Sequence, residues 1–563
     1  MNSNILDIQN LSLRFGNNEI LKKVSFSIPK GKIVGVVGES GSGKSITSLA
    51  VMGLLPKSAQ IPSESEILFH SDSKTIDLLK LSPEQKRKYR GNEIGMIFQE
   101  PMTSLNPSIR CGEQVEEAIR LHLKMEKTAA KKRVIELFEK VLLPNPERIY
   151  KAYPHELSGG QRQRVMIAMA ISCNPKILIA DEPTTALDVT VQRTILDLIK
   201  HLQREIGLSC IFISHDLGVI AEVCDEVVVM YQGEIVEKGS VQEIFENPKE
   251  NYTKGLISCR PRLDIRQKDL PTIADYLKNE NYQSEIYTSD ERQAFHQEIY
   301  SQIPILEVKN LSKYFYSKPS LLGKEEVSVK AVDDVSFKVY PGETMGLVGE
   351  SGSGKTTLSR TVLLLEKPTE GEIFYHGKDI VKLSKGEVRK LRKEIQIIFQ
   401  DPYSSLNPRM NISEILTSPM KVHSIGKNQK ERIKRAGDLL EKVGLSRSDL
   451  KKYPHEFSGG QRQRIGIARA LALHPKFIIC DESVSALDVS VQAQVLNLLN
   501  DLKEEFGLTY IFISHDLAVV KYMSDQLLVM QYGQPKELGD ADEIYANPTT
   551  QYTKDLIEAI PKL

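Results

Sequence analysis

The sequence repeats itself at a distance of 300 to 311 residues, and this repeat restricts the possible folds more than any other feature. Residues 153–164 read YPHELSGGQRQR and residues 453–464 read YPHEFSGGQRQR, so the two stretches differ at one position. IFISHDL at 211–217 returns at 511–517, and GESGSGK at 38–44 returns at 349–355. Solenoid repeats have periods of roughly 20–50 residues, far shorter than this one. The chain is therefore predicted to contain two whole domains in tandem.

We predict the first domain at residues 1–260, a linker at 261–303 and the second domain at 304–563. The linker is polar and mixed in charge, without a clear apolar period. Each copy begins with alternating apolar segments that predict antiparallel strands, and continues with compact apolar runs, separated by helical stretches, that predict buried strands. In the first copy these are strands at Ile5–Phe15, Val24–Ile28, 32–37, Ile177–Ala180 and Cys210–Ile213, and helical stretches at 46–54 and 112–142. The pattern predicts an α/β fold with a mainly parallel core sheet.

Neither the charge balance nor the cysteine content is typical of a nucleic-acid-binding protein or of a disulphide-rich secreted protein. Lys+Arg and Asp+Glu both total 74, so the net charge gives no overall attraction to nucleic acid or to anionic lipid. The six cysteines include no CxxC pair, which indicates reduced, structural cysteines in a cytosolic protein. No apolar run approaches the ~18 residues of a spanning helix, and the N-terminus does not read as a secretory signal. If the protein acts at a membrane, we expect the spanning parts on other chains.

A phosphate-binding loop is predicted in each copy. Residues 38–45 read GESGSGKS and residues 349–356 read GESGSGKT, and both fit GxxxxGK[ST] between an apolar strand and a helical run. Glycines let the backbone curl so that its N–H groups point at phosphate oxygens, while the lysine reaches the β- and γ-phosphates and the final hydroxyl ligates Mg²⁺. The predicted nucleotide-binding residues are Gly38, Glu39, Ser40, Gly41, Ser42, Gly43, Lys44 and Ser45, with Gly349, Glu350, Ser351, Gly352, Ser353, Gly354, Lys355 and Thr356.

Two carboxylates end an apolar strand in each copy. Asp181 and Glu182 follow ILIA, and Asp481 and Glu482 follow FIIC. Strands of α/β sheets deliver functional groups at their carboxyl ends. We expect Asp181 and Asp481 to hold Mg²⁺, and Glu182 and Glu482 to polarise the water that attacks the γ-phosphorus.

The SGGQ stretches resemble the LSGGQ signature of ATP-binding cassette (ABC) proteins, and the resemblance extends over nearly all of both copies. It implies two tandem P-loop (RecA-like) nucleotide-binding domains, each with an N-terminal antiparallel β-subdomain and a helical subdomain, that hydrolyse ATP with Mg²⁺. The signature residues it implies for nucleotide binding are Ser158, Gly159, Gly160 and Gln161, with Ser458, Gly459, Gly460 and Gln461.

The resemblance implies further roles in each copy. Gln99 and Gln400 match the Q-loop glutamine, which touches Mg²⁺ or the attacking water, and His215 and His515 match the switch histidine. The resemblance thus implies Glu182, Glu482, His215, His515, Gln99 and Gln400 as catalytic residues, and Ser45, Gln99, Asp181, Thr356, Gln400 and Asp481 as metal ligands. Ala186–Asp188 and Ala486–Asp488 match the loop that crosses between cassettes. Phe15 and Phe315 stand where the family stacks an aromatic ring on adenine, with Tyr314 and Tyr316 as alternatives to Phe315.

In ABC proteins the phosphate loop of one cassette faces the signature of the other, so the resemblance implies that the cassettes pair within this chain with ATP between them. QEPMTSLNP and QDPYSSLNP, together with an NP…YTK stretch ending each copy, resemble the ATPase subunits of oligopeptide, dipeptide, nickel and glutathione importers. The first copy looks like the D-type subunit and the second like the F-type. Only Cys259 stands where many such subunits carry a cysteine cluster, so no iron–sulphur centre is expected, and Ser483 replaces the usual proline after the Asp–Glu pair.

The expected function is therefore that of the ATP-hydrolysing, energy-coupling subunit of an importer for peptides or related small solutes. It would lie at the cytoplasmic face of the inner membrane, with two permease subunits and an extracytoplasmic binding protein as partners, and without nucleic acid. Two alternatives stay open on the sequence: an exporter ATPase, and a soluble tandem ABC ATPase that acts on ribosomes or DNA.

Overall fold

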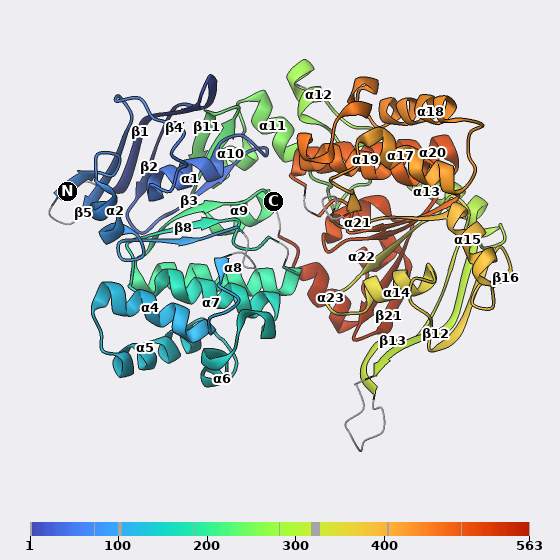
Figure 1. Ribbon diagram of the computed structural model, residues 1–563, viewed down its shortest axis with the longest axis horizontal. Coiled ribbons are helices and arrows are strands. Elements are labelled where there is room, and N and C mark those ends of the chain that lie inside the picture. The colour runs from blue at the N-terminus through green and yellow to red at the C-terminus, as the bar shows by residue number, and fades with distance from the viewer. Residues whose placement is uncertain are drawn as a thin grey trace. The chain divides into compact units, whose positions relative to one another are not determined.

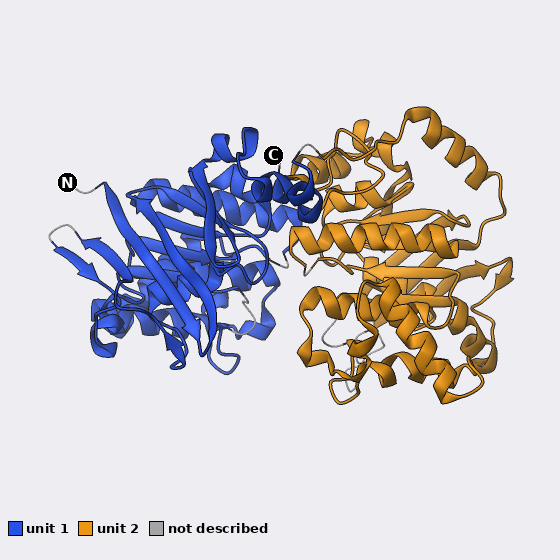
Figure 2. Cartoon of the chain, turned by 90° about the horizontal axis from the view of Figure 1, so that it is seen from above, with its two compact units in different colours: residues 1–257, 273–281, 561–563 blue, residues 258–272, 282–560 orange. Residues whose placement is uncertain are grey.

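The computed structural model divides the chain into two compact units, coloured separately in Figure 2. Unit 1 comprises Met1–Ile257, Ile273–Asn281 and Pro561–Leu563, and unit 2 comprises Ser258–Thr272 and Tyr282–Ile560. The structure describes residues 3–71, 74–99, 104–185, 187–280, 282–316, 327–401, 405–485 and 487–561. None of the helices in these ranges combines the length and the apolar content needed to cross a bilayer.

Unit 1 begins with an antiparallel sheet that has one face against the core. Its strands run in the order β2 (Asn18–Pro29), β1 (Asn4–Phe15), β5 (Glu66–Ser71), β6 (Lys74–Asp77), with β4 (Ala59–Gln60) paired to β1. Along β1, Leu6 and Ile8 are buried while Asp7 and Gln9 are more exposed. This alternation is typical of a sheet with one face on the core and the other toward solvent.

The second sheet of unit 1 is mainly parallel and carries the functional loops. Its order is β11 (Glu234–Ser240), β10 (Glu226–Tyr231), β3 (Ile33–Val37), β9 (Ser209–Ile213), β8 (Ile177–Asp181), β7 (Ile94–Ile97), and only β11 pairs antiparallel. Every residue of β3, β8 and β9 is buried. Continuous burial is typical of parallel strands that are covered on both faces.

A single apolar core joins the two sheets of unit 1. Leu6 and Phe26 of the antiparallel sheet belong to the same buried cluster as Ile179 and Ile213 of the parallel sheet. Figure 1 shows a group of helices, α4 to α7, on the opposite side of the parallel sheet from the antiparallel strands. The helices of unit 1 are α1 (Lys44–Met52), α2 (Pro83–Tyr89), α4 (Cys111–Leu123), α5 (Lys127–Lys140), α6 (Pro146–Lys151), η1 (Pro154–Glu156), α7 (Gly159–Ile171), α8 (Val189–Ile206), α9 (Leu217–Val223), α10 (Val241–Glu246), α11 (Asn251–Ser258) and α12 (Ile273–Lys278).

Unit 2 repeats this architecture. Its antiparallel sheet has the order β13 (Val327–Val339), β12 (Leu306–Tyr316), β15 (Glu370–Tyr375), β16 (Lys378–Asp379), and its mainly parallel sheet has the order β17 (Ile395–Ile398), β18 (Phe477–Asp481), β19 (Thr509–Ile513), β14 (Thr344–Val348), β20 (Gln526–Gln531), β21 (Gln534–Asp540). Its helices are α13 (Ser289–Tyr300), α14 (Lys355–Val362), α15 (Lys385–Glu394), α17 (Ile412–Val422), α18 (Gln429–Lys442), η2 (Arg447–Lys451), η3 (Pro454–Glu456), α19 (Gly459–Leu471), α20 (Val489–Phe506), α21 (Leu517–Met523), α22 (Ala541–Ala546) and α23 (Gln551–Glu558).

These elements confirm the predicted fold class and the strands and helices expected of the first copy. The stretch 112–142 is two helices rather than one, because the chain turns at Lys124, whose φ is 52°. The first copy is longer than the second before its glutamine loop, and part of the extra length lies between α1 and β5, where β4 is inserted.

The segment at 261–303, expected from sequence to be a linker, contains α12 and α13 and contributes most of its residues to unit 2. It is held there by a buried group of charges. Arg292 Nη1 lies 2.7 Å from Asp525 Oδ1, and Lys503 Nζ lies 3.3 Å from Asp525 Oδ2. The Asp525 side chain is 3% exposed. Burial alone would raise the pKa of Asp525, but the charges of Lys503, Arg292 and Arg266 outweigh it and lower the pKa.

The corresponding carboxylate of unit 1 is satisfied differently. Asp225 Oδ1 pairs with Lys32 Nζ at 2.9 Å. The side chain of Asp225 is 35% exposed and that of Lys32 is 53% exposed, so solvent screens this pair. The second copy has Glu343 in place of Lys32, fully buried, and burial raises the pKa of this carboxyl to about 8. The second copy thus lacks a cation at the position of Lys32, and Lys503 of α20 together with arginines of the linker segment supplies the charge that Asp525 needs.

We predict that Arg292→Ala lowers the free energy of unfolding by about 3 kcal/mol, because it leaves the buried Asp525 with a weaker counter-charge. Urea and thermal unfolding of the full chain, followed by circular dichroism, would measure the change. The matched control is Lys32→Ala in unit 1, which breaks a solvent-screened pair and should leave the unfolding midpoint unchanged. Equal shifts for the two variants would contradict this assignment.

Candidate functional site

In unit 1 the loop between β3 and α1 has a backbone shape that only glycines permit. Gly38, Gly41 and Gly43 have φ of 144°, 83° and 104°, and the corresponding glycines of unit 2 have φ of 148°, 81° and 104°. A Cβ on Gly38 would lie 2.1 Å from the carbonyl oxygen of Met230. The first glycine therefore allows both the left-handed backbone and the close approach to β10.

The lysine of each loop is folded into the curve of its own backbone. Lys44 Nζ donates to the carbonyl oxygens of Gly38 and Glu39, both at 2.8 Å, and Lys355 Nζ donates to those of Gly349 and Glu350 at 2.7 and 2.8 Å. Lys44 is 8% exposed and begins α1. A buried ammonium beside a helix N-terminus and a curled backbone is an arrangement suited to phosphate groups.

A hydroxyl and a carboxylate meet beside the loop of unit 1. Ser45 Oγ donates to Asp181 Oδ1 at 3.0 Å, which brings the second residue of α1 to the end of β8. Burial raises the pKa of Asp181 to about 6, although the Ser45 hydrogen bond opposes the shift. One hydroxyl and one carboxylate oxygen are hard ligands that fit a magnesium ion bound mainly by phosphate oxygens and water.

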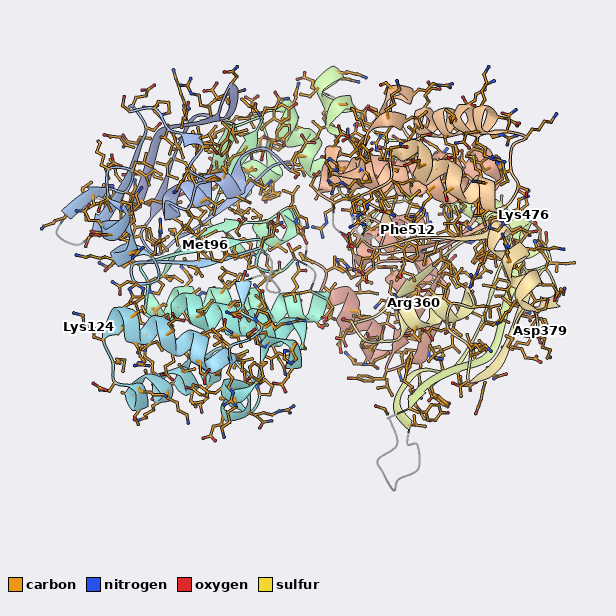
Figure 3. All side chains as sticks on the ribbon, viewed as in Figure 1. Met96, Lys124, Arg360, Asp379, Lys476 and Phe512 are labelled. Carbon is orange, nitrogen blue, oxygen red and sulfur yellow. The ribbon has the colours of Figure 1, made fainter. Side chains whose placement is uncertain are left out.

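Unit 2 places Thr356 and Asp481 in the corresponding positions, in α14 and at the end of β18. Burial and the neighbouring charge of Glu482 raise the pKa of Asp481 to about 6, against the positive charge of Arg360. Arg360 is labelled on α14 in Figure 3.

The next carboxylate, Glu182, is surrounded by the other predicted catalytic residues. Gln99 Nε2 and Thr185 Oγ1 each donate to Glu182 Oε2 at 2.9 Å, and His215 Nδ1 lies 3.3 Å from the same oxygen. Glu182 has a φ of 50° in the left-handed region, which is uncommon for a residue with a side chain and is frequent at functional sites. Gln99 and His215, which are distant from Glu182 in sequence, thus meet the nearby Thr185 at one carboxylate oxygen.

Unit 2 reproduces the contacts of the glutamine and the histidine, whereas Ser485 Oγ donates to the backbone carbonyl of Glu482 and not to its carboxylate. Gln400 Nε2 donates to Glu482 Oε2 at 2.6 Å, His515 Nδ1 lies 3.7 Å from the same oxygen, and the φ of Glu482 is 48°. The substitution of Ser483 for proline leaves the loop geometry nearly the same, because Glu482 N donates to Ile513 O at 2.9 Å as Glu182 N does to Ile213 O.

The histidines keep both glutamates ionised. Burial alone would raise the pKa of Glu182, but the hydrogen bond and charge of His215 outweigh it and lower the pKa to about 2. For Glu482, burial opposes and His515 again prevails, so the pKa is lowered. Burial would lower the pKa of His215, yet Glu182 raises it. Each site therefore holds a carboxylate ready to accept a hydrogen bond from water.

The predicted metal role of the glutamines stays a prediction. In both units the amide nitrogen of the glutamine donates to the glutamate that follows the strand, through Gln99 to Glu182 and through Gln400 to Glu482. A side-chain rotation of the amide would be needed to turn its oxygen toward a cation.

The signature stretches form the first turns of α7 and α19. Ser158 is the N-cap of α7: its Oγ accepts from Gln161 N at 3.3 Å, and Gln161 Oε1 accepts from Ser158 N at 3.1 Å. Ser458 and Gln461 form the same capping box, with distances of 3.3 and 3.0 Å. The serine and glutamine thus fix the start of the helix and leave its first N–H groups directed outward.

The two glycines of each signature have different environments. A Cβ on Gly160 would lie 2.7 Å from Val191 Cγ1, and one on Gly460 would lie 2.3 Å from Val491 Cγ1, so packing against the next helix requires a glycine there. A Cβ on Gly459 would meet no atom within 4 Å, and one on Gly159 would meet only Leu187 at 3.8 Å. Packing within the unit therefore does not require a glycine at position 159 or 459. The space beside each of these two residues could hold part of a ligand.

The remaining predicted residues lie as follows. Phe15 is half-buried against the unit 1 core, whereas Phe315 is 41% exposed at the end of β12. Tyr314, one alternative to Phe315, donates its hydroxyl to Asp333 Oδ1 at 2.8 Å, and Tyr316, the other, is exposed. Asp188 and Asp488 of the crossing loops are the N-caps of α8 and α20, and Ala186 and Ala486 lie outside the described residues.

Comparison with known proteins identifies the family. The ABC transporter model matches residues 21–185 and 332–485, and the model for the C-terminal region of oligopeptide/dipeptide transporters matches 236–284 and 537–563. The chain is 46% identical over 564 aligned positions to the glutathione import ATP-binding proteins GsiA of Escherichia coli O157:H7 and Shigella dysenteriae, covering 99% of this chain and 90% of each relative. The solved structure of cbiO1 from Clostridium perfringens is similar over 44% of this chain and 92% of that one, at 28% identity and a TM-score of 0.38.

The fold and the two phosphate-loop motifs are those of an ATPase with two cassettes, and the chain belongs to the ABC transporter family. Within that family it is an ATP-hydrolysing, energy-coupling subunit of the oligopeptide/dipeptide transporter group. The resemblance drawn from the sequence motifs is confirmed.

We predict opposite outcomes for alanine at the two glycines of the second signature. Gly460→Ala should lower the free energy of unfolding by about 1–3 kcal/mol, because its Cβ collides with Val491. Gly459→Ala should not lower it, because the Cβ enters open space in a helical turn where alanine is favoured. Thermal unfolding of both variants provides the measurement. A loss of stability in Gly459→Ala as large as that in Gly460→Ala would contradict the packing argument.

Proposed function

We propose that this chain powers the import of a peptide or peptide-like solute and that both of its cassettes hydrolyse ATP. The observation that carries the proposal is the repeated geometry around Glu182 and Glu482. Each glutamate follows a buried strand, has a left-handed backbone, and is approached by the glutamine and the histidine of its own cassette. Neither cassette shows a substitution at these positions that would remove the base.

In this proposal the residues of each loop bind the nucleotide. The ammonium groups of Lys44 and Lys355, held by carbonyls of their own loops, would also donate to the β- and γ-phosphates, and the loop N–H groups surround the phosphate oxygens. Ser45 with Asp181, and Thr356 with Asp481, would hold Mg²⁺, which neutralises charge on the phosphates. Phe15 and Phe315 would contact the adenine.

The glutamates act on the water. Glu182 and Glu482, kept ionised by the histidines, accept a hydrogen bond from the attacking water and orient it toward the γ-phosphorus. Gln99 and Gln400 orient the glutamate or the water, and His215 and His515 stabilise the charge around the γ-phosphate. Protonation of either glutamate would remove its ability to accept this hydrogen bond.

We also propose that the cassettes complete each other's sites. The room beside Gly159 and Gly459, together with the outward N–H groups of α7 and α19, would receive the γ-phosphate bound to the other cassette. ATP would then favour the paired state and hydrolysis would release it. The segment that joins the cassettes in one chain raises their effective concentration toward one another.

The transport partners are proposed from the family. The relatives are named for glutathione import, so a small peptide-like solute is the proposed cargo. Separate permease subunits in the membrane and an extracytoplasmic binding protein would select it, and this chain would be peripheral at the cytoplasmic face. No iron–sulphur centre is proposed, because Cys259 has no neighbouring cysteines in the sequence.

The test of the catalytic proposal is the double substitution Glu182→Gln and Glu482→Gln. ATP binding should be retained, while turnover should fall by at least roughly 10²-fold, because the carboxylates that orient water are gone. ATP hydrolysis and equilibrium ATP binding measure the two effects. Glu117→Gln, an exposed change on α4, is the control. Vigorous hydrolysis by the double variant would overturn the proposal.

The test of the transport proposal is reconstitution with the permease subunits in vesicles. Radiolabelled glutathione and dipeptides, supplied with the binding protein on the side opposite the ATPase, should accumulate only when ATP is present on the ATPase side. Movement in the opposite direction would identify an exporter.

A further inference from the structure

The C-terminal region of each cassette contacts its phosphate loop through one tyrosine. In the first cassette the N–H of Glu39 donates to Tyr252 Oη at 3.1 Å, although the two residues are 213 positions apart. In the second cassette the N–H of Glu350 donates to Tyr552 Oη at 3.0 Å, across 202 positions. Tyr252 and Tyr552 are the tyrosines of the two NP…YTK stretches, and both lie in the matched C-terminal regions.

The hydrogen bond acts on the peptide unit that also faces the lysine of the phosphate loop. The N–H of Glu39 and the carbonyl of Gly38 belong to one planar peptide group. While the N–H donates to Tyr252, the carbonyl accepts from Lys44 Nζ at 2.8 Å on its other side. In the second cassette the carbonyl of Gly349 accepts from Lys355 Nζ at 2.7 Å. The tyrosine hydroxyl therefore fixes the orientation of the carbonyl that holds the lysine.

The short helix that carries each tyrosine is itself held from the C-terminal hairpin. In the first cassette the carboxylate of Glu237 on β11 accepts from the N–H groups of Lys249 and Glu250, at 2.8 and 3.2 Å. In the second, Glu537 on β21 accepts from those of Thr549 and Thr550, at 2.9 and 3.4 Å. These bonds place the residues just before α11 and α23, and so position the tyrosine.

The shared element is the hydroxyl rather than the packing of the ring. The Tyr252 ring lies 4.2 Å from that of Tyr231, at a tilt of 32°. The second cassette has Gln531 at the position of Tyr231, so this ring contact is not repeated there. The bond from the hydroxyl to the loop is present in both cassettes with nearly the same length.

We propose that Tyr252 and Tyr552 are positioning residues for nucleotide binding, by which the C-terminal region of each cassette sets the orientation of the first peptide unit of the phosphate loop. The inference rests on the proposed role of these loops in binding ATP. Tyrosine-to-phenylalanine substitution removes this acceptor and its restraint on the peptide unit, which is then freer to rotate. Rotation would withdraw the carbonyl that holds the lysine in the loop and disorder the phosphate cradle.

The experiment measures equilibrium binding of ATP to the full chain in the Glu182→Gln and Glu482→Gln background, where turnover does not interfere. Tyr252→Phe should raise the Kd of one of the two sites roughly tenfold, Tyr552→Phe that of the other, and the double variant both. In the otherwise unchanged enzyme the double variant should raise KM for ATP and leave kcat within roughly twofold, because its effect is on the loop that binds phosphate and not on the glutamate.

The matched control is Tyr231→Phe, which removes the hydroxyl of the ring neighbour and keeps both rings. It should leave ATP affinity unchanged, and each single variant, Tyr252→Phe, Tyr552→Phe or Tyr231→Phe, should keep the thermal midpoint of the parent. If Tyr252→Phe changes the midpoint but not ATP affinity, or if Tyr231→Phe weakens ATP binding equally, the inference is wrong.

Failure of the underlying proposal gives a different result. Lys44→Ala combined with Lys355→Ala should abolish ATP binding if these loops hold the nucleotide. Undiminished binding by that variant would overturn the proposed function. Loss of binding in the lysine variant, together with normal binding in both phenylalanine variants, would overturn only the role of the tyrosines.

Discussion

The close approach of each phosphate loop to the end of the neighbouring strand is the constraint on which the site depends. Gly38 turns with its α-carbon against the carbonyl of Met230, the second-to-last residue of β10, so no side chain fits there. The N–H of Gly233, in the turn after β10, donates to Ser42 O at 3.2 Å, which fixes the other end of the loop. The loop is therefore held by the C-terminal hairpin of its own cassette. This hairpin also carries Glu237, so the same element supports the segment before α11.

The two cassettes keep the contacts of the glutamine and the histidine with the glutamate, and they differ on the surface of unit 2 where the segment at 261–303 (the joining segment) packs. Asn497 exchanges two hydrogen bonds with the backbone of Leu270, at 2.9 and 2.8 Å. The first cassette has Asp197 at this position, which could not donate to a carbonyl. Likewise Glu343 replaces Lys32, and the buried Asp525 receives arginines from the segment. Sequence differences between the copies thus assign the joining segment to one cassette without altering either site.

Much of the site could be predicted because its residues stand at ends of buried strands. Asp181 ends β8, His215 comes shortly after β9, and the glycine-rich loop that leads to Lys44 follows β3, and parallel strands place their carboxyl ends at one edge of the sheet. The left-handed φ of Glu182 and the role of Tyr252 could not be predicted in this way. The first is a backbone conformation imposed by the loop, and the second requires two segments 213 positions apart to meet. The repeated YTK stretch was the available signal for Tyr252, but its spacing says nothing about its contact.

The joining segment shows the limit of reasoning from composition. A polar stretch of mixed charge is typical of a flexible linker, because it offers little apolar area to bury. Here Arg292 and Arg266 are only 13% and 10% exposed, and their partners are acidic residues of unit 2 that precede or follow β20 and β21. The charges of the segment are complementary to one particular surface, and that complementarity is visible only once the second cassette has folded.

The hydrogen bonds of Glu182 place a condition on catalysis by the proposed mechanism. Its Oε2 accepts from Gln99 and Thr185 and faces His215, so this oxygen is already surrounded by donors of its own cassette. A water molecule that used the same oxygen would have to displace at least one of them. Gln99 follows β7 and His215 follows β9, whereas Thr185 belongs to the loop of Glu182 itself and its N–H donates to Glu182 O at 3.3 Å, so only Gln99 and His215 approach the carboxylate from other loops. In the proposed mechanism, movement of the loop that carries Gln99 or His215 would free the oxygen of Glu182 for the attacking water. ATP hydrolysis would then depend on the positions of these two loops.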